Sequence, residues 1–295
     1  MSIISHVHPA TKVFWFSWGY DLYHYCWSEE QLYLPLTYQY RQKRRKSPTE
    51  RLKALAHAVL DKVIANPDHW RSAVIARTDY CSTIVPTEYP IIRALPGFRA
   101  KEVFFNYGSM ESLIAAMHKQ QADGDNILVG NSNSPTSNHV DAFEKIAASG
   151  LTKHKVIVPL GYGVDNPYKA FVLDRGKYYF GNRFEPLLDF LPLAEYWKIV
   201  ASCQTAVFNH TRQQALGNVL ITTWLGANVY LNPQNPIYSH FKNIGISLYD
   251  FSLPFALHPA TTPSDVMQAR ERLQSEYGAE VVRNRVVELL ALRAS

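Results

Sequence analysis

Residues 126–148 read NILVGNSNSPTSNHVDAFEKIAA, which is an apolar run, a loop of small polar residues and a helix-like segment in succession. The run Ile127, Leu128 and Val129 is typical of a buried strand, and residues 139–148 are typical of a helix. The same order recurs downstream, where we expect strands at residues 156–160, 205–208 and 228–231 and helices at residues 193–202 and 216–225. Strands that alternate with helices predict a parallel sheet of the α/β class.

The loops that follow the predicted strands carry most of the polar residues of this region. In an open parallel sheet the ligand lies beyond the carboxyl ends of the strands. These ends fall at residues 130–134, 161–163, 209–214 and 232–234. We therefore predict ligand contacts from Gly130, Asn131, Ser132, Gly161, Tyr162, Asn209, Gln213, Gln214, Gly217, Asn218 and Asn232.

The loop at residues 209–218 combines a permanent cation, two amides and a helix start. Arg212 is the cation, and Gln213 and Gln214 are the amides. This combination suits a pyrophosphate leaving group, which gains charge as its bond breaks. The alternative for this loop is a polar cap on an ordinary surface helix. For the loop at residues 130–132 the alternative is an ordinary turn, because glycine, asparagine and serine are common in turns for conformational reasons alone.

The first part of the chain also alternates apolar runs with helix-like stretches. We expect strands at residues 13–17, 72–76, 83–85 and 103–107 and a helix at residues 50–64. A long helical tract at residues 265–292, broken near Gly278, is expected to pack back on this first unit. The predicted domains are therefore residues 1–123, residues 124–264 and a C-terminal tract at residues 265–295.

The composition is that of a globular protein and excludes several other classes. The chain has 295 residues, of which 47% are hydrophobic and 19% are charged, so it is neither disordered nor collagen-like. No run of about 18 apolar residues is present. Residues 1–10 lack the apolar segment of a secretory signal, so we expect a cytoplasmic protein. Three widely spaced cysteines without a CxxC pair indicate neither a disulfide framework nor a thiolate zinc site.

Few other residues show a catalytic pattern. Asp21 follows the first predicted strand beside Trp18 and Tyr20, so it is a candidate base or sugar-hydroxyl acceptor, with a helix cap as the alternative. The sequence contains neither an HExxH nor a GxSxG motif. We find no DxD-type carboxylate pair near the candidate phosphate loops and predict catalysis without a metal ion and without a cofactor.

Most of the net charge of +5 comes from one basic run, which contains Arg41, Lys43, Arg44, Arg45 and Lys46. Tyrosines and leucines precede the run, so attraction to anionic lipid head groups is one interpretation. A solvated loop between two helices is another. Nucleic acid is the least favoured partner, because no RNA-binding or DNA-binding signature accompanies the run.

Several motifs occur in a fixed order along about residues 14–250. They are Phe14 and Trp15, Trp18 to Tyr23, Ile127 to Ser132, Lys155 to Tyr162, Arg212 to Gln214 with Gly217, and Leu231 and Asn232 with Asn235 and Pro236. The ordered set resembles the bacterial Fuc4NAc transferases of enterobacterial common antigen synthesis, which form glycosyltransferase family 56. This set is far more specific than any single motif in it.

The resemblance implies a GT-B glycosyltransferase, with two Rossmann-like domains facing a cleft and the first domain short. It implies transfer of 4-acetamido-4,6-dideoxy-D-galactose, or a related deoxyamino sugar, from a dTDP-sugar to a polyprenyl-diphosphate-linked saccharide. The donor site would lie in the second domain, with Arg212 and Asp21 as candidate catalytic residues. Trp18, Tyr20 and the basic run would face the acceptor or the anionic inner surface of the bacterial cytoplasmic membrane.

One feature departs from that family. Its members carry a considerable segment before the first-domain motif, whereas 13 residues precede Phe14 here. We therefore expect either a compact relative or a chain that lacks the early strands, and acceptor binding is the property most affected. A non-catalytic peripheral membrane scaffold that uses the basic run is the alternative function.

Overall fold

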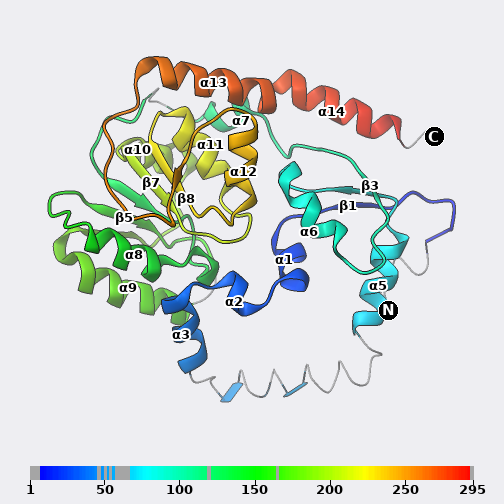
Figure 1. Ribbon diagram of the computed structural model, residues 1–295, viewed down its shortest axis with the longest axis horizontal. Helices are drawn as coiled ribbons and strands as arrows, with labels where there is room; N and C mark the ends of the chain where they lie inside the picture. The colour runs from blue at the N-terminus through cyan, green and yellow to red at the C-terminus, as the bar shows by residue number, and fades with distance from the viewer. Residues whose placement is uncertain are drawn as a thin grey trace.

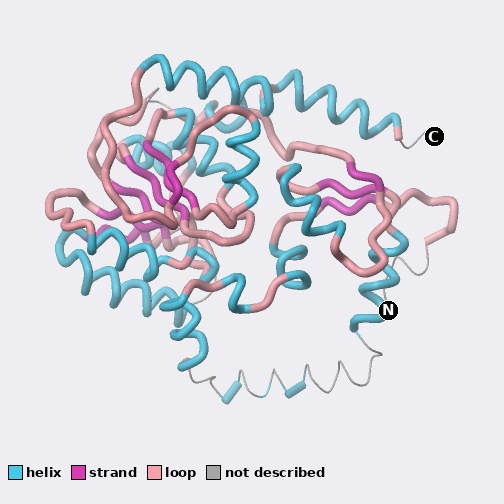
Figure 2. The backbone as a smooth tube through the Cα atoms, viewed as in Figure 1, coloured by secondary structure: helices cyan, strands magenta, loops and turns pink. Residues whose placement is uncertain are grey.

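The computed structural model describes residues 7–44, 48–49, 52, 55–56, 67–117, 121–163 and 166–292. Two separate parallel sheets organise these residues into two α/β domains (Figures 1 and 2). The first sheet has the order β1-β2-β3, with β1 Phe14–Phe16, β2 Tyr80–Ser82 and β3 Lys101–Glu102. The second has the order β6-β5-β4-β7-β8-β9, with β4 Ile127–Val129, β5 Val156–Pro159, β6 Phe184–Leu187, β7 Thr205–Phe208, β8 Asn228–Leu231 and β9 Tyr249–Asp250.

The second sheet grows in two directions from its centre. The chain adds β5 and β6 on one side of β4, then returns and adds β7, β8 and β9 on the other side. Ile127 of β4 pairs in parallel with Val156 of β5 and with Thr205 of β7. The carboxyl ends of β4 and β7 therefore border the crevice at which such sheets bind ligands.

Helices cover both faces of the second sheet. Ile127 and Val129 face a core formed with α8 His139–Ala148 and α9 Asn166–Phe180. Leu128 faces the opposite core, which is formed with α10 Leu193–Ala201, α11 Leu216–Trp224, α12 Pro236–Asn243 and α13 Pro263–Tyr277. Because both faces are covered, the central strands β4 and β5 are continuous apolar runs in the sequence.

A third and smaller core holds the first domain together. Leu22 and Tyr23 of α1 Tyr20–Cys26 pack with Cys81 of β2 and with Ile92 of α6 Tyr89–Arg93. The other described elements of this region are α2 Glu29–Leu32, α3 Pro35–Lys43, α5 Pro67–Arg77, the 3₁₀ turn η2 Pro86–Glu88 and α7 Met110–Ile114.

The sequence predicted the second domain better than the first. Every strand and helix predicted between residues 126 and 231 is present to within one residue, whereas α9, α12, β6 and β9 were not predicted. In the first domain the predicted strand at residues 72–76 is wrong, because these residues lie in α5. The strands predicted at residues 83–85 and 103–107 are also wrong. Residues 83–85 follow β2, and the pairing of β3 with β2 ends at Glu102, before residues 103–107. The helix predicted at residues 50–64 falls largely outside the described residues.

Helix α3 packs on the second domain, although it belongs to the first 123 residues. The Asp141 carboxylate of α8 accepts hydrogen bonds from the N–H groups of Leu36 and Thr37, at 2.8 and 3.1 Å, and from the Thr37 hydroxyl at 2.7 Å. Tyr40 stacks on Phe171 of α9, with ring centroids 4.1 Å apart. Asp141 therefore caps the start of α3 from the other domain.

The C-terminal tract is shared between the two domains. Helix α13 packs on α11 of the second domain, and α14 Ala279–Ala291 continues along the first domain (Figure 1). There the Arg285 guanidinium lies 4.4 Å from the centre of the Phe104 ring and donates a hydrogen bond to Asn106. The predicted packing of residues 265–295 on the first domain is seen for α14, and α13 also contacts α7, which lies within the first 123 residues.

Candidate functional site

A cavity of about 580 Å³ lies between the two domains. Asn131, Ser132 and residues 212–217 form its wall on the second domain, beyond the carboxyl ends of β4 and β7. Trp18, Tyr20, Ile84, Asn106 and Tyr107 are among the first-domain residues that face them. The cavity therefore occupies the crevice that the strand order predicts.

Arg212 brings a buried positive charge to this cavity. Its side chain is 9% exposed, and Nη1 donates a hydrogen bond of 2.8 Å to the Gln213 carbonyl. Within the described part of the chain Arg212 forms no salt bridge, and its buried Nε has no hydrogen-bond partner. Burial lowers the pKa of the guanidinium, so the protein meets a desolvation cost for this charge without a counter-ion. An anion in the cavity would supply the missing counter-charge for the Arg212 guanidinium.

The start of helix α11 supplies unpaired backbone donors beside Arg212. Its N-cap residue is Ala215, which offers no side-chain cap, and Val219 makes the first intrahelical hydrogen bond, to the Ala215 carbonyl. The N–H groups of residues 216–218 therefore lack backbone acceptors. No atom lies within 4 Å of the position that a Cβ on Gly217 would occupy, so this helix start is open to the cavity. Such a helix start favours an anionic ligand.

The loop after β4 lines the cavity with Asn131 and Ser132, but the helix start that follows it is closed. We expected the helix start that follows residues 130–132 to meet a phosphate, but the start of α8 is occupied. The Asn138 side chain, at the N-cap of α8, accepts a hydrogen bond from Leu34 and donates to the Leu32 carbonyl, so the first domain covers this end. The anion-facing helix start is therefore that of α11.

Gly130 is required where it stands. Its φ is +72°, and a Cβ there would lie 2.6 Å from Nε2 of buried His139. Burial lowers the pKa of His139 to about 3, so this imidazole is neutral. Gly130 thus lets the chain turn tightly against a neutral ring at the base of the crevice.

Gln214 links the two loops that border the crevice. Its Nε2 donates to Asn131 Oδ1 at 3.0 Å, and its Oε1 accepts from the Thr136 hydroxyl at 2.6 Å. Asn131 Oδ1 also accepts from His210 Nε2 at 3.1 Å. Gln214 lines the cavity, but its amide is used to hold the loop after β4 against the loop after β7.

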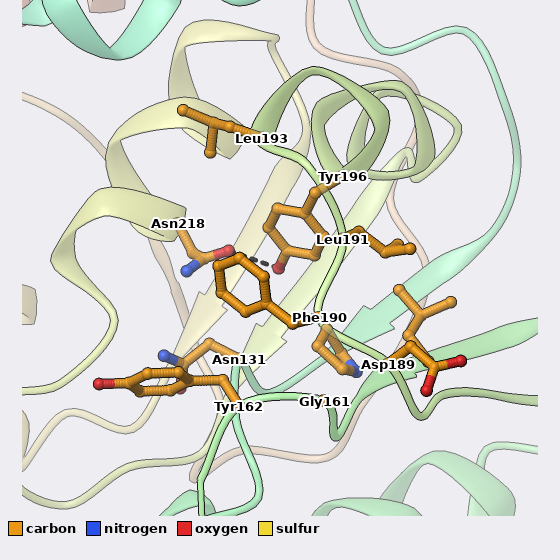
Figure 3. Close-up of a pocket in the computed structure, with 11 residues that line it drawn as sticks. Asn131, Gly161, Tyr162, Asp189, Phe190, Leu191, Leu193, Tyr196 and Asn218 are labelled. Carbon is orange, nitrogen blue, oxygen red and sulfur yellow. Dashed lines mark hydrogen bonds between the residues drawn. The ribbon is translucent and has the colours of Figure 1, made fainter.

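A second cavity of about 240 Å³ adjoins the first and shares Asn131 and Tyr162 with it. Figure 3 shows the Phe190 ring projecting between Asn218 and Tyr162. Phe190 and Tyr162 are 79% and 68% exposed, and the Tyr196 hydroxyl donates to Asn218 Oδ1 at 2.6 Å. This cavity offers aromatic faces and amide groups, which suit a planar heterocycle.

The remaining predicted donor residues divide into two groups. Gly161 lines the smaller cavity, where a Cβ would collide with the backbone of Asp189. Asn209 and Asn232 line neither cavity and bond to each other at 3.3 Å. Asn209 and Asn232 therefore stabilise the loops after β7 and β8 without facing either cavity.

On the first-domain wall, Trp18 and Tyr107 form an exposed aromatic pair. Their ring centroids are 4.1 Å apart, and the Tyr107 hydroxyl donates to the Ser17 carbonyl at 2.7 Å. Tyr20 beside them is 66% exposed. Sugar rings commonly bind through their C–H faces to such aromatic surfaces, so this pair suits a saccharide.

Both carboxylate oxygens of Asp21 accept hydrogen bonds from nearby residues of the same segment. One carboxylate oxygen accepts from the Trp15 indole at 3.0 Å, and the other from the Trp18 N–H at 2.8 Å. Asp21 is not among the residues that line either cavity. Asp21 lies in the first turn of α1, whose N-cap is Gly19, and among the described residues it makes no helix-cap hydrogen bond, so a catalytic role for Asp21 stays a prediction.

The basic run is only partly described, because Arg45 and Lys46 lie outside the described residues. Arg41 pairs with Glu29 at 2.6 Å and lies over the Tyr33 ring, whereas Lys43 is exposed at the end of α3. Among the helices of the described residues, none combines the length and apolarity needed to span a bilayer. In the same residues, no group of three or more His, Cys, Asp and Glu side chains could hold a metal ion.

Sequence reasoning missed Phe190, Tyr196 and Tyr107. Phe190 follows β6, a strand that was not predicted, Tyr196 lies in the predicted helix α10, and Tyr107 was assigned to a strand. The signal available for Phe190 was an aromatic residue directly after a polar one at a strand end. It becomes visible only once β6 is recognised.

Two parallel α/β domains with a cavity between them at the strand ends define the GT-B architecture. Sucrose-phosphate synthase (tll1590) from Thermosynechococcus elongatus is similar, with a TM-score of 0.59 and 12% identity over 77% of this chain and 62% of that one. An α,α-trehalose-phosphate synthase (UDP-forming) from Burkholderia vietnamiensis gives 0.56 and 8% over 76% and 62%. Anabaena Alr3699/HepE, in complex with UDP and glucose, gives 0.57 and 12% over 76% and 66%. The chain thus spans less than two thirds of the length of these proteins.

The family model of the group 56 glycosyl transferases, described as 4-alpha-L-fucosyltransferase, matches residues 89–275. This match covers more than half of the chain and includes the second-domain wall of the cleft, with Asn106 and Tyr107 of the first-domain wall. The chain belongs to glycosyltransferase family 56. The resemblance that the ordered motifs suggested is therefore confirmed, as is the GT-B fold.

Proposed function

We propose that this chain transfers 4-acetamido-4,6-dideoxy-D-galactose, or a related deoxyamino sugar, from a dTDP-sugar to a polyprenyl-diphosphate-linked saccharide. One observation carries the donor half: a buried arginine without a counter-ion stands beside an uncapped helix start in the inter-domain cavity. Family membership supports the transfer of a sugar. The particular sugar and the lipid-linked acceptor follow from the motif resemblance.

The donor fits the two cavities as a bent molecule. Its diphosphate would lie against Arg212 and the start of α11, and its base would enter the smaller cavity beside Phe190 and Tyr162. Asn218 lines the smaller cavity and belongs to the first turn of α11, so base and diphosphate would be adjacent. The sugar would then point across the cleft toward the Trp18 and Tyr107 pair, which we assign to the acceptor saccharide.

A melting-temperature panel tests this proposal directly. We expect dTDP and dTDP-sugars to raise the melting temperature, since a ligand at a hundred times its Kd adds about 2.7 kcal/mol of stability. Other nucleoside diphosphates serve as the comparison for base specificity. If no nucleotide changed the melting temperature while anionic vesicles still bound the protein, the non-catalytic scaffold would be the better interpretation.

The transfer step needs charge stabilisation at the leaving group. As the bond from the sugar C1 to the diphosphate oxygen breaks, its electron pair stays on the diphosphate, and the acceptor hydroxyl forms the new bond and loses its proton. Arg212 and the N–H groups at the start of α11 would stabilise the charge that develops there. Asp21 is proposed as the proton acceptor only in a state that releases one of its two hydrogen bonds.

We predict that activity survives EDTA, because Arg212 and the α11 start can perform the electrostatic task of a divalent ion. Asp123 and Asp125 form a DxD-type pair, but they precede β4, whereas the cavities lie beyond its carboxyl end. The measurement is dTDP release from a dTDP-sugar with and without EDTA. Loss of activity that magnesium or manganese restores would show that this assignment is wrong.

We place the protein on the inner face of the bacterial cytoplasmic membrane, held there by the basic run. Replacing Lys43, Arg44, Arg45 and Lys46 with glutamine is expected to release it from anionic vesicles while dTDP affinity is retained, since each basic residue near such a surface contributes about 1 kcal/mol. Arg41 is left in place because it pairs with Glu29. Vesicle sedimentation measures the effect.

A matched control removes the same charge elsewhere, by changing the exposed residues Lys177, Lys198, Lys242 and Arg272 to glutamine. This control should keep vesicle binding. If both variants bound vesicles equally, the basic run would be a solvated segment, and another surface, such as α14, would bind the protein to the membrane.

A further inference from the structure

A buried carboxylate lies behind the first-domain wall of the cleft. Glu88, at the end of the 3₁₀ turn η2, is fully buried and accepts hydrogen bonds from the Tyr23 hydroxyl at 2.8 Å and from the Val85 N–H at 3.1 Å. In the described part of the chain no lysine, arginine or histidine forms a salt bridge with it. Neither Glu88 nor Tyr23 lines either of the two cavities assigned to the donor, so neither would touch it.

Helix α1, which carries Tyr23, packs against the loop that carries Arg212. Burial raises the pKa of Tyr23, and the Gln213 backbone of the second domain is among the nearby groups that oppose this rise. The first domain contacts this loop at two points. A Cβ on Gly19 would lie 2.7 Å from Gln213 Oε1, and the Thr211 hydroxyl donates to the Leu32 carbonyl at 3.1 Å.

The charges of this group are coupled as well. The Arg212 guanidinium is destabilised by burial, and the negative charge of Glu88 is among the influences that stabilise it. Glu88 thus fixes the Tyr23 side chain of α1 through a hydrogen bond and acts on Arg212 through its charge. A loop held in its binding conformation loses less conformational entropy when the ligand arrives.

We propose that Glu88 and Tyr23 are positioning residues for the donor diphosphate, which hold Arg212 and Gln213 of the other domain in the conformation that binds it. The first domain would then contribute to donor affinity without touching the donor. This inference rests on the proposed function, because it assumes that a diphosphate binds at Arg212.

The test compares Tyr23→Phe and Glu88→Gln with the wild type by calorimetric titration of dTDP-glucose. The comparison is made below pH 7, where Glu88 is protonated and Glu88→Gln has the same charge as the wild type. There each variant is expected to raise the Kd about tenfold, the equivalent of one lost hydrogen bond. The double variant should be no weaker than the worse single one, because both act through one chain of contacts. Circular dichroism and melting curves check that each variant is folded.

Tyr89→Phe is the matched control. Tyr89 is also a buried tyrosine of the first domain, but its hydroxyl bonds to the carbonyls of Val103 and Cys81 and makes no contact with the Arg212 loop. It should lower the melting temperature without changing the Kd. A merely structural role for Tyr23 predicts the same result for Tyr23→Phe, and that result would overturn the proposal.

A pH series adds a readout that folding alone would not move. Burial raises the pKa of Glu88 to about 7, and the groups that face it are Tyr23 and Asp21 from α1, Cys81 from β2, Tyr107 after β3 and Arg212. A bound diphosphate adds negative charge and favours protonated Glu88, so the complex binds more protons than the free protein near neutral pH. The affinity for dTDP-glucose should therefore fall as the pH rises through about 7.

The Glu88→Gln variant should lose this pH dependence, because the diphosphate diester of dTDP-glucose does not itself titrate near neutrality. Equal pH profiles for the two proteins would count against the inference. If wild type bound no dTDP-glucose, the proposed function would fail together with it. If wild type and both variants bound equally well, the proposed function would stand and only this inference would fail.

Discussion

Arg212→Ala is expected to raise the Kd for dTDP-glucose by about 100-fold. The loss of charge-assisted hydrogen bonds in a desolvated site costs about 3 kcal/mol, which corresponds to two orders of magnitude in affinity. The turnover number should fall by a further factor of about 100, because the guanidinium meets more charge in the transition state than in the ground state. The free protein should be at least as stable as wild type, since a buried charge without a counter-ion has been removed.

Calorimetry and the release of dTDP measure these two effects separately. Arg212→Lys should be intermediate, because it keeps the charge and loses the two-pronged geometry. Arg175→Ala is the control, since Arg175 lies on α9 over the Tyr178 ring and lines neither cavity. Unchanged affinity in Arg212→Ala would remove this residue from the donor site.

Gly217→Asp is expected to abolish donor binding while the protein remains folded. The new side chain would project into open space, and a carboxylate in the first turn of α11 is favoured by the helix dipole by about 0.3–1 kcal/mol. That carboxylate would also occupy the site assigned to the diphosphate. A variant that gains stability and loses ligand binding is difficult to explain by misfolding.

Two other variants complete this test. Gly217→Asn has nearly the same size without the charge, so it should weaken dTDP-glucose binding much less than Gly217→Asp. Gly130→Ala should instead lower the melting temperature, because it forces a positive φ and a contact of 2.6 Å with His139. If Gly217→Asp and Gly217→Asn bound equally well, the anion would not lie at the start of α11.

The second domain could be predicted from the sequence because its strands are covered on both faces. Runs such as Val156 to Pro159 and Thr205 to Phe208 are wholly buried, so they are apolar without interruption and their ends coincide with polar loops. The first domain offers no such contrast. Residues 72–76 form an apolar run of the same length as a strand, and only their surroundings place them in a helix.

The candidate site shows the same division. Arg212 and Gly217 could be found because one loop carries a cation and opens a helix within a few residues. Glu88 and Tyr23 could not, because they are 65 positions apart and meet only in the folded core. The role of Asn138 was likewise hidden, since its partner Leu34 lies 104 positions away.

The cap that Asp141 places on α3 determines how this protein can be divided or recombined. A fragment that starts at residue 124 would keep Asp141 and Phe171 but lose the N–H groups and the Tyr40 ring that they bind. A chimaera that exchanges the donor domain between relatives would face the same mismatch. The unit that can be exchanged as a whole is therefore discontinuous in the gene, and it comprises residues 35–43, which form α3, together with the second domain.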